Sequence, residues 1–334
     1  MLKKNKTILI AEAGVNHNGD SKKIIKLIKI ASEANVDFVK FQSFKSDKLV
    51  TTKAKVANYQ KKNTNYKFQI DLLKNLELKD KQYTLIIDSC KKYKVKPLFT
   101  PFDIESLTYL KKFKLNYFKV GSSDIDNVQL LKELAKLKKT IFLSTGMSKL
   151  YDIKFCLNTL IKHGQRKDKI YVMHCNTDYP TSFADVNLNA MQTIRQKFNI
   201  KVGYSDHTLG IEVPIAAASL GADVIEKHFT INKNLTGPDH KASLDKKELI
   251  KMVSSIRNIE KSLGSKLKKI TKSELKNISK VKKSIYANKE ISKGEVFSPK
   301  NLIIKRPYTG LSGKNWDKLI GKISKKNYKK DDII

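Results

Sequence analysis

VGYSDHTLGIEVPIAAASLGADVIEKHFTINKNLTGPDHK (residues 202–241) carries the clearest indication of how this chain folds. Two short apolar runs, residues 200–204 and 222–225, each end on polar side chains that can bind ligands. The first run is followed by Ser205-Asp206-His207 and the second by Glu226-Lys227-His228. The alanine-rich segment between them predicts a helix that packs closely on a sheet. A strand, a helix and a strand with polar ends predict a βαβ unit at the rim of an active site.

His207 and His228 would lie on adjacent parallel strands, at the same end of the predicted sheet. Two imidazoles in that arrangement suit one divalent metal ion. The alternative is two histidines of the core or rim whose ring nitrogens are satisfied by hydrogen bonds. The matched register and the Gly-Pro-Asp-His turn at residues 237–240 favour the metal site.

Eight short β-rich runs alternate with amphipathic helical stretches. The runs are residues 7–11, 36–41, 95–100, 117–120, 140–144, 170–174, 200–204 and 222–225. The helical stretches are residues 21–34, 80–93, 104–113, 128–137, 151–163, 186–198, 211–220 and 245–263, the last with Asp245 as its N-cap. This alternation predicts an α/β fold of the (β/α)₈ TIM-barrel type. A doubly wound open sheet is the runner-up, disfavoured because no glycine-rich dinucleotide turn follows the first strand.

The chain changes character after the predicted barrel, which occupies residues 1–265. Residues 266–283 are lysine-rich and weakly apolar, and they predict a linker or connecting helix. Residues 284–334 hold short β-type pieces separated by glycine and proline, which predicts a small second domain. A domain of about 50 residues is marginal alone, so we expect it to dock on a barrel.

The longest interruption of the barrel pattern is residues 43–71. It lacks clear periodicity and holds Lys45, Lys48, Tyr59 and Tyr66. A loop of this length at the predicted catalytic face favours a function over a simple connection.

The formal net charge of +35 over 334 residues invites a nucleic-acid hypothesis. Many lysines, however, alternate with isoleucine and leucine at helical spacing, as in residues 22–30, and so form the solvated faces of amphipathic helices. We therefore expect no nucleic-acid partner, and attraction of anionic substrates explains the charge more simply. No apolar run approaches the ~18 residues needed to span a bilayer. Three widely spaced cysteines, Cys90, Cys156 and Cys175, predict reduced thiols in a cytoplasmic protein without a membrane partner.

In a TIM barrel, side chains at the carboxyl ends of the strands face the substrate. Each predicted strand end carries usable side chains. In chain order they are Glu12, Asn16 and His17; Lys40 and Gln42; Thr100 and Phe102; Lys119 and Ser122; Ser144 and Thr145; Asn176 and Tyr179; Ser205 and His207; Glu226 and His228.

Lys40 and Lys119 are the most informative of these, because each interrupts an apolar strand. Burying a lysine costs several kcal/mol unless an anion compensates its charge. The functional hypothesis is a clamp for phosphate and carboxylate groups. The alternative is that the lysines pair with Glu12 or Asp206 inside the barrel. Glu12 is otherwise a candidate general base beside the metal.

Seven motifs follow one another along the chain: IAEAGVNHNG (10–19), VKFQ (39–42), TPFD (100–103), LSTGM (143–147), YSDH (204–207), EKHFT (226–230) and GPDH (237–240). In this order they resemble the sialic acid synthase family. Residues 289–306, KEISKGEVFSPKNLIIKR, resemble the C-terminal SAF (antifreeze-like) domain of that family. The resemblance covers essentially the whole chain.

The resemblance implies a barrel that condenses phosphoenolpyruvate, an open-chain acetamido sugar and water into a nine-carbon 2-keto sugar acid and phosphate. His207 and His228 would hold Mn²⁺, with Mg²⁺ or Co²⁺ as alternatives. The residues expected around phosphoenolpyruvate are Lys40, Thr100, Lys119, Ser122, Ser144 and Ser205. The residues expected around the sugar and the reacting water are Glu12, Gln42, Tyr179 and Asp239, with Phe102 and Asn176 completing the substrate-binding set. Arg306 would reach the sugar's N-acetyl group from a partner subunit, which implies a domain-swapped homodimer.

Two departures limit what the family pattern implies. Ser122-Ser123-Asp124 stands where the family commonly has Ser-Gly-Glu, so the carboxylate is shorter. Arg306-Pro-Tyr-Thr-Gly310 stands in place of Arg-Pro-Gly-Asn-Gly, which would reshape the N-acetyl pocket.

Three questions of function stay open at this point. The acceptor is N-acetylmannosamine or 2,4-diacetamido-2,4,6-trideoxymannose, giving N-acetylneuraminate or N,N'-diacetyllegionaminate. Another synthase that uses phosphoenolpyruvate to make 3-deoxy-2-keto acids, such as pseudaminate synthase, is the alternative enzyme. A binding protein built on an inactive barrel would require broken chemistry at the strand ends, and the sequence shows none.

Overall fold

The computed structural model describes residues 6–56, 64 and 66–334, and the chain divides into two compact units, Met1–Gly264 and Ser265–Ile334. The predicted linker, residues 266–283, falls in the second unit by this division. Tyr59, named above in the long interruption, lies outside the described residues. Within the described part of the chain, no helix is long and apolar enough to cross a membrane.

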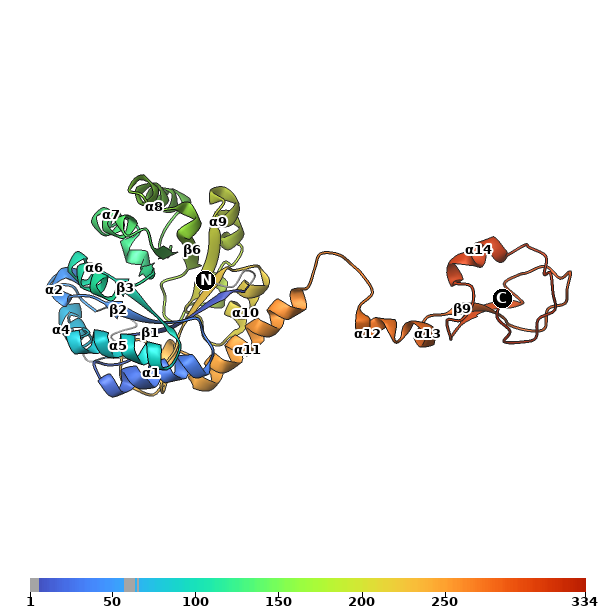
Figure 1. Cartoon of the computed structure of the whole chain (residues 1–334), viewed down its shortest axis with the longest axis horizontal. Coiled ribbons are helices and arrows are strands. Elements are labelled where there is room, and N and C mark those ends of the chain that lie inside the picture. Colours follow the sequence, from blue (N-terminus) through green and yellow to red (C-terminus); the bar gives the residue numbers. More distant parts are fainter. Residues whose placement is uncertain (1–5, 57–63, 65) are drawn as a thin grey trace. The chain divides into compact units, whose positions relative to one another are not determined.

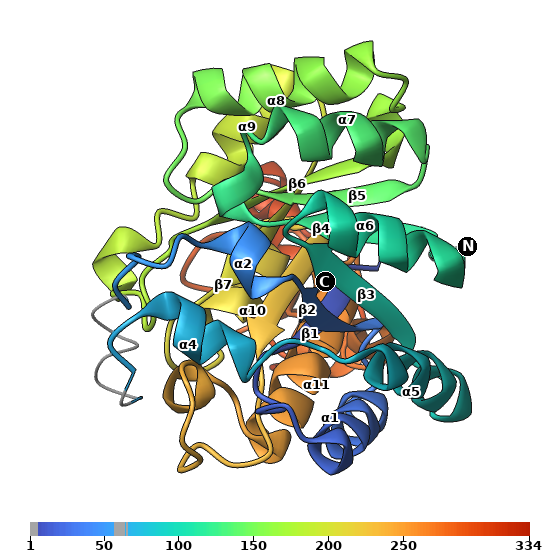
Figure 2. The ribbon, with the colours of Figure 1, turned by 90° about the vertical axis from the view of Figure 1, so that its left-hand side faces the viewer.

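Eight parallel strands form the centre of the first unit (Figures 1 and 2). They are β1 (Ile8–Gly14), β2 (Phe38–Ser43), β3 (Lys96–Pro101), β4 (Tyr117–Val120), β5 (Thr140–Ser144), β6 (Ile170–Cys175), β7 (Lys201–Asp206) and β8 (Val224–His228). The hydrogen-bonded order is β3-β2-β1-β8-β7-β6-β5-β4. Because β3 and β4 also contact each other, the sheet curls into a nearly closed barrel. The predicted TIM barrel is confirmed, and the open doubly wound sheet is excluded.

A ring of helices surrounds these strands (Figure 1). It contains α1 (Ser21–Glu33), α5 (Asp80–Lys92), α6 (Ile104–Leu110), α7 (Val128–Lys136), α8 (Leu150–Lys162), α9 (Ala190–Phe198), α10 (Glu212–Ser219) and α11 (Lys246–Leu263). Asp245 is the N-cap of α11, as predicted, and forms a capping box with Glu248. Helix α9 begins four residues later than predicted. Asn187 adopts a left-handed φ of 48°, which an α-helix does not accommodate.

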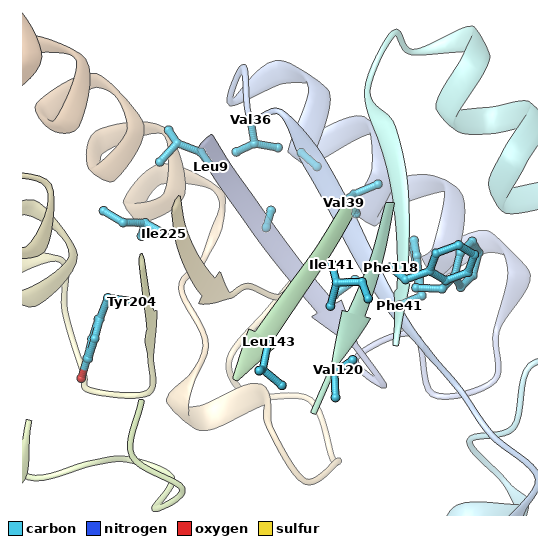
Figure 3. Close-up of a cluster of buried hydrophobic side chains, with 14 of the residues drawn as sticks. Leu9, Val36, Val39, Phe41, Phe118, Val120, Ile141, Leu143, Tyr204 and Ile225 are labelled. Atoms are coloured by element: carbon cyan, nitrogen blue, oxygen red, sulfur yellow. The ribbon is translucent and has the colours of Figure 1, made fainter. Parts of the chain in front are cut away.

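The alternation of side chains along each strand sets the two sides of the barrel wall. Residues facing outward, such as Leu9, Val39 and Ile225, pack against the helices and form the main core (Figure 3). Residues facing inward, such as Ile10 and Phe38, form a second apolar cluster inside the barrel. The next inward positions toward the carboxyl end are polar, so a charged layer lies directly above an apolar plug.

A third, smaller apolar cluster forms around the segment between β2 and α5. The short helices α2 (Ser46–Leu49) and α4 (Gln69–Lys74) belong to this excursion of the chain and contact each other (Figure 2). Val15, Phe44 and Leu76 are among the buried residues of its core. The part of the predicted loop that the structure describes is therefore anchored by packing of its own.

The second unit contains α12 (Lys272–Leu275), α13 (Ile278–Val281), β9 (Ser284–Ala287), β10 (Leu302–Lys305) and α14 (Trp316–Leu319). Strands β9 and β10 pair antiparallel. Ile285, Ile291 and Phe297 are buried in a separate apolar cluster. This unit thus has a core of its own, as expected of a small second domain.

Candidate active site

A cavity of about 620 Å³ is lined by residues at the carboxyl ends of the barrel strands. The predicted site residues that line it are Glu12, Lys40, Gln42, Thr100, Phe102, Lys119, Ser122, Ser144, Tyr179, Ser205, His207 and His228. They come from every strand of the barrel or from the turn that follows it. The structure therefore brings together most of the side chains that the sequence singled out.

Several of the polar side chains belong to the strands themselves and face into the barrel near the carboxyl end of each strand. Glu12 is paired in register with Lys40 on one side and with His228 on the other. Strands β1 and β8 therefore extend three residues further than their apolar runs. Parallel pairing continues through the charged residues because their backbone groups still need hydrogen-bond partners.

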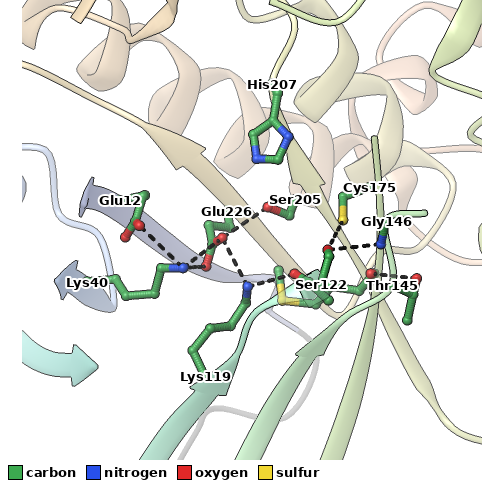
Figure 4. A network of polar contacts seen from close by, with 12 residues as sticks. Glu12, Lys40, Lys119, Ser122, Thr145, Gly146, Cys175, Ser205, His207 and Glu226 are labelled. Carbon is green, nitrogen blue, oxygen red and sulfur yellow. Dashed lines mark hydrogen bonds and ion pairs between the residues drawn. The ribbon is translucent and has the colours of Figure 1, made fainter. Parts of the chain in front are cut away.

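Glu226 connects the two buried lysines (Figure 4). Lys40 Nζ lies 3.1 Å from Glu226 Oε2 and 3.4 Å from Glu12 Oε1. Lys119 Nζ lies 3.3 Å from Glu226 Oε1 and donates to Ser144 Oγ at 2.6 Å. Ser205 Oγ also donates to Glu226 Oε1, at 3.0 Å. Two lysines thus share one carboxylate, and each keeps a fixed position at the cavity floor.

The alternative considered above, in which the lysines pair with Glu12 or Asp206, is correct only for Glu12. Lys40 does contact Glu12, but Asp206 faces the opposite side of the barrel wall. Its carboxylate pairs there with Lys227 at 2.5 Å and accepts from Thr208. Asp206 and Lys227 are both completely buried, so this pair balances its own charge and leaves the cavity lysines to Glu12 and Glu226.

Burial and charge perturb the acid–base properties of this cluster. Burial raises the pKa of Glu12 to about 7, although Lys40 acts against this shift. Burial disfavours the charge of Lys40, yet Glu12 and Glu226 together raise its pKa above the usual value. Burial, aided by Lys40, lowers the pKa of Lys119 despite the attraction of Glu226. The two lysines outweigh burial at Glu226 and hold its pKa well below the usual range.

The two histidines lie together as predicted, with ring centroids 5.5 Å apart. His207 Nδ1 donates to the backbone carbonyl of Asn176 at 2.5 Å, so the neutral ring presents a lone pair at Nε2. Burial lowers the pKa of His207 to about 4 and that of His228 well below its usual value. Neutral imidazoles are the form that binds metal ions.

Asp239 lies beside the second histidine. Its Oδ2 is 4.0 Å from His228 Nδ1, and burial raises the pKa of its carboxyl to about 6. The loop that carries it is tied down, since Ser243 Oγ donates to the Asp239 carbonyl and Asn16 Nδ2 donates to Ser243 Oγ. Asp239 is therefore held close to the histidine pair, although it does not line the cavity itself.

Several buried polar atoms at the site have no hydrogen-bond partner among the described residues, among them Glu12 Oε2, Thr100 Oγ1 and His228 Nδ1. Unsatisfied buried groups are rare in proteins and call for a ligand or ion. The donor set of two neutral histidines with a carboxylate nearby fits a divalent metal ion that is completed by water or substrate. Within the described ranges, no group of three or more His, Cys, Asp and Glu side chains forms a metal site by itself.

Three predicted residues lie outside the cavity lining. Asn176 contributes its backbone carbonyl to His207, while its side chain points to the Asp185 carbonyl at 3.5 Å. Asp239 is placed as described above. Arg306 is an exposed residue of the second unit, where its Nε donates to the Val281 carbonyl at 2.9 Å.

Asp124, the shorter carboxylate noted above, does not line the cavity. It accepts hydrogen bonds from Ser123 Oγ and Asn127 Nδ2, and burial raises its pKa. Ser122, two residues before Asp124, does line the cavity, and its hydroxyl accepts a hydrogen bond from the Gly146 N–H at 2.9 Å. Asp124, which stands where the family commonly has glutamate, thus hydrogen-bonds within its own turn.

The structure adds cavity residues that the sequence did not single out. Glu226 was recognised only as a strand-end residue, although its spacing of two from His228 already indicates an inward side chain. Leu49, Val50 and Leu73 line the cavity from the excursion between β2 and α5. No local pattern indicated them, because that segment lacks the periodicity of a strand or a long helix.

Comparison with known proteins shows which family the chain resembles along its length. The model of the NeuB family matches residues 27–268, and the SAF domain matches residues 282–334. The chain is 50% identical over 330 residues to N,N'-diacetyllegionaminic acid synthase of Campylobacter jejuni subsp. jejuni serotype O:2, covering 98% of this chain and 99% of that protein. It is 40% identical to the synthase of the same name from Legionella pneumophila, covering 94% and 89%.

A solved structure agrees with the fold. The crystal structure of N-acetylneuraminic acid (sialic acid) synthetase from Leptospira borgpetersenii serovar Hardjo-bovis, in complex with citrate, matches with a TM-score of 0.73 and 32% identity. The match covers 82% of this chain and 91% of that one.

Proposed function

The chain belongs to the NeuB family, and we propose from this that it condenses phosphoenolpyruvate with an open-chain acetamido sugar and water. The products are a nine-carbon 2-keto sugar acid and phosphate. The acceptor proposed first is 2,4-diacetamido-2,4,6-trideoxymannose, which gives N,N'-diacetyllegionaminate. The identity of 50% over nearly the whole length of a synthase of that name supports this choice over N-acetylmannosamine.

The observation that carries the proposal is the buried pair Lys40 and Lys119, joined by Glu226 at the floor of the cavity. Two lysines and two carboxylates balance when Glu12 is ionised, so the floor has no excess charge to repel an anion. Phosphoenolpyruvate brings a phosphate and a carboxylate, which the lysine ammonium groups bind as point charges. The hydroxyls of Ser144, Ser205 and Thr100 supply further donors.

Binding in this way positions carbon 3 of phosphoenolpyruvate against the sugar aldehyde, and positioning alone lowers the barrier of a reaction between two molecules. As the bond between these carbons forms, the double bonds of phosphoenolpyruvate and of the aldehyde open, the aldehyde oxygen takes up a proton from solvent, and carbon 2 is left cationic. Water then adds to carbon 2. Glu12 Oε2 is the proposed acceptor for the proton of that water, and its pKa of about 7 suits proton exchange near neutral pH. Cleavage of the carbon–oxygen bond at carbon 2 releases phosphate.

His207 and His228 are the proposed protein ligands of a divalent ion, Mn²⁺ first, with Mg²⁺ and Co²⁺ as alternatives. When bound, such an ion supplies a Lewis acid for the oxygen of the aldehyde. Two features support this assignment: His228 Nδ1 has no hydrogen-bond partner among the described residues, and His207 Nε2 presents a lone pair. Asn176 orients the first ring through its carbonyl, a role that partners of metal-bound histidines commonly have.

The proposed assembly is a homodimer in which the SAF domain of one subunit serves the barrel of the other, with Arg306 at the sugar's N-acetyl group. Two observations support it. Arg306 is exposed within its own unit. Large apolar side chains of residues 265–334 are also exposed, among them Leu267 at 77% and Ile323 at 64%.

The test is a phosphate-release assay with phosphoenolpyruvate, Mn²⁺ and each acceptor sugar in turn. We expect release with the trideoxy acceptor and slower release with N-acetylmannosamine. A third arm uses the acceptor of pseudaminate synthesis, which has the same substituents with different stereochemistry. A faster reaction in that arm would replace the proposed product by pseudaminate.

A further inference from the structure

The cavity has two chemically different sides. Its floor is charged, with Lys40, Lys119 and Glu226 in contact. A second side is built by Leu49, Val50, Leu73 and Phe102, which line the same cavity with apolar groups. Nothing in the chemistry of phosphoenolpyruvate, a small trianion, requires an apolar surface of that kind.

Packing holds the apolar side in place. Leu49, Leu73 and Phe102 pack against the cluster formed by Val15, Phe44, Val56, Leu72 and Leu76. These three side chains therefore have the cluster on one side and the cavity on the other. Gln69 also lines this region, but its side-chain amide is engaged, since Nε2 donates to the Lys55 carbonyl at 2.9 Å. A packed wall of this type keeps its shape when the ligand changes.

We propose that Leu49, Val50, Leu73 and Phe102 form a specificity wall that selects acceptors with apolar substituents at the end remote from the aldehyde. The proposal rests on the proposed function and deepens it. The trideoxy acceptor has a methyl group where N-acetylmannosamine has a hydroxymethyl group, and an acetamido group where it has a hydroxyl. Methyl groups gain free energy when they are buried against leucine and phenylalanine.

A hydroxyl facing the same wall loses its hydrogen bonds to water and finds no replacement. Hydrophobic pockets discriminate between ligands that differ by one such group by about 10- to 200-fold in kcat/KM. The wall therefore favours the trideoxy sugar by a factor in that range and does not exclude N-acetylmannosamine completely. Lys40 and Lys119 bind the other substrate, so the wall leaves the KM for phosphoenolpyruvate unaffected.

The experiment measures kcat/KM for both acceptors in the full-length enzyme with Mn²⁺, by phosphate release. In Leu73→Asn, the amide offers hydrogen bonds to a hydroxyl and replaces apolar surface, while the side chain stays branched at Cγ. We expect the preference for the trideoxy acceptor to fall about tenfold or more, with KM for phosphoenolpyruvate within about twofold of the wild type. Leu49→Asn provides a second, independent variant if Leu73→Asn does not fold.

The matched control compares Leu73→Ala with Leu72→Ala. Leu72 is the neighbouring residue of α4, is buried in the same cluster and does not line the cavity. Leu72→Ala should lower the melting temperature and leave the ratio of the two kcat/KM values unchanged. The wall is refuted if Leu72→Ala changes that ratio as much as Leu73→Ala, or if both asparagine variants keep the wild-type ratio. If the folded wild-type enzyme releases phosphate with neither sugar, the proposed function is wrong and the wall is refuted with it.

Discussion

At the scale of single residues, Glu226 explains how two like charges are tolerated at the bottom of a barrel. Its carboxylate contacts Lys40 at 3.1 Å and Lys119 at 3.3 Å, and all three side chains are buried. Without it, the two ammonium groups would repel each other in a medium of low polarity. Glu226 therefore compensates the charges of both lysines and holds the two ammonium groups apart at the floor of the cavity.

Lys119→Met tests this arrangement. The substitution keeps the length of the side chain but removes the charge that faces the proposed phosphate. We expect the apparent affinity for phosphoenolpyruvate to weaken by about 2–5 kcal/mol, the range for truncating one partner of a buried charge pair. KM for phosphoenolpyruvate is the measurement, and KM for the sugar should change much less.

Lys96→Met is the control for that variant, because Lys96 begins β3 at the opposite end of a strand and is exposed. It should leave both KM values as they are. An unchanged KM for phosphoenolpyruvate in Lys119→Met would show that the clamp has been placed wrongly.

His228→Ala tests the proposed metal ligand. Its Nδ1 is buried without a hydrogen-bond partner among the described residues, so removing it leaves no new unsatisfied group. The melting temperature should therefore stay close to that of the wild type. Turnover should fall by about 10³-fold or more, since a bound cation contributes several kcal/mol of charge stabilisation.

Removal of metal by a chelator should inactivate the native enzyme to the same extent, and added Mn²⁺ should restore it. His163→Ala is the matched control for His228→Ala, because His163 caps the C-terminus of α8, hydrogen-bonds the Thr159 carbonyl and does not line the cavity. Full turnover in the presence of the chelator would contradict the metal assignment.

At the scale of elements, the turn after β1 links the fold to the site. Asn16 and His17 follow Gly14, the last residue of β1, and both are completely buried. His17 Nδ1 accepts a hydrogen bond from the Gly19 N–H at 3.0 Å, which requires the neutral ring. Asn16 meanwhile holds the β8 loop through the Phe229 carbonyl and Ser243. This one turn thus orders the start of α1 and the loop that carries Asp239.

The stability of this turn should depend on pH. Burial, helped by Lys23, lowers the pKa of His17 to about 4 from 6.5. The unfolded chain therefore takes up a proton at His17 before the native protein does. Its contribution to stability is fully present above pH 6.5 and is lost as the pH falls toward 4. We expect the loss to reach about 3 kcal/mol.

Denaturant unfolding of the wild type and of His17→Gln at several pH values measures that contribution. The difference in unfolding free energy between the two proteins should shrink steadily from pH 7 to pH 4, which isolates His17 from carboxylates that titrate in both. A difference that stays constant with pH would mean that His17 is not held neutral by the fold.

The elements also show what the sequence could predict. Apolar runs and helical periodicity gave the eight strands and the barrel, because these signals are local. Lys40 and Lys119 could be singled out because each interrupts an apolar strand, and His228 because it follows one. The role of Asn176 could not be found in this way, since it acts through a backbone carbonyl whose direction depends on the turn. The wall of Leu49 and Leu73 also escaped prediction, because two distant segments create it by packing together.

At the scale of the whole molecule, the chain consists of two units that each have a core. The main core of the barrel is extensive, while Ile285, Ile291 and Phe297 lie in the small core of the second unit. A small domain gains stability by burying its remaining apolar surface against another body. If the SAF domain contributes a residue to an active site, the question is whether that site lies in the barrel of its own subunit or of the partner subunit.

Mixing two inactive variants answers this question. Arg306→Ala removes the proposed sugar contact of the second unit, and His228→Ala removes a proposed metal ligand of the barrel. If the SAF domains are exchanged, one site of the mixed dimer receives both defects. The other site combines an intact barrel with an intact Arg306. Equal mixing gives half of the dimers this composition, and one of their two sites is intact, so activity should recover to about a quarter of the wild type.

In an unexchanged dimer each subunit keeps its own defect, and mixing recovers no turnover. The measurement is phosphate release after subunit exchange, with formation of the mixed dimer verified by native mass spectrometry. Each variant alone provides the baseline, and a mixture of His228→Ala with His207→Ala is the control, because both defects lie in the barrel and should never be rescued. Mixed dimers without recovered activity would show that Arg306 acts on its own barrel or on none.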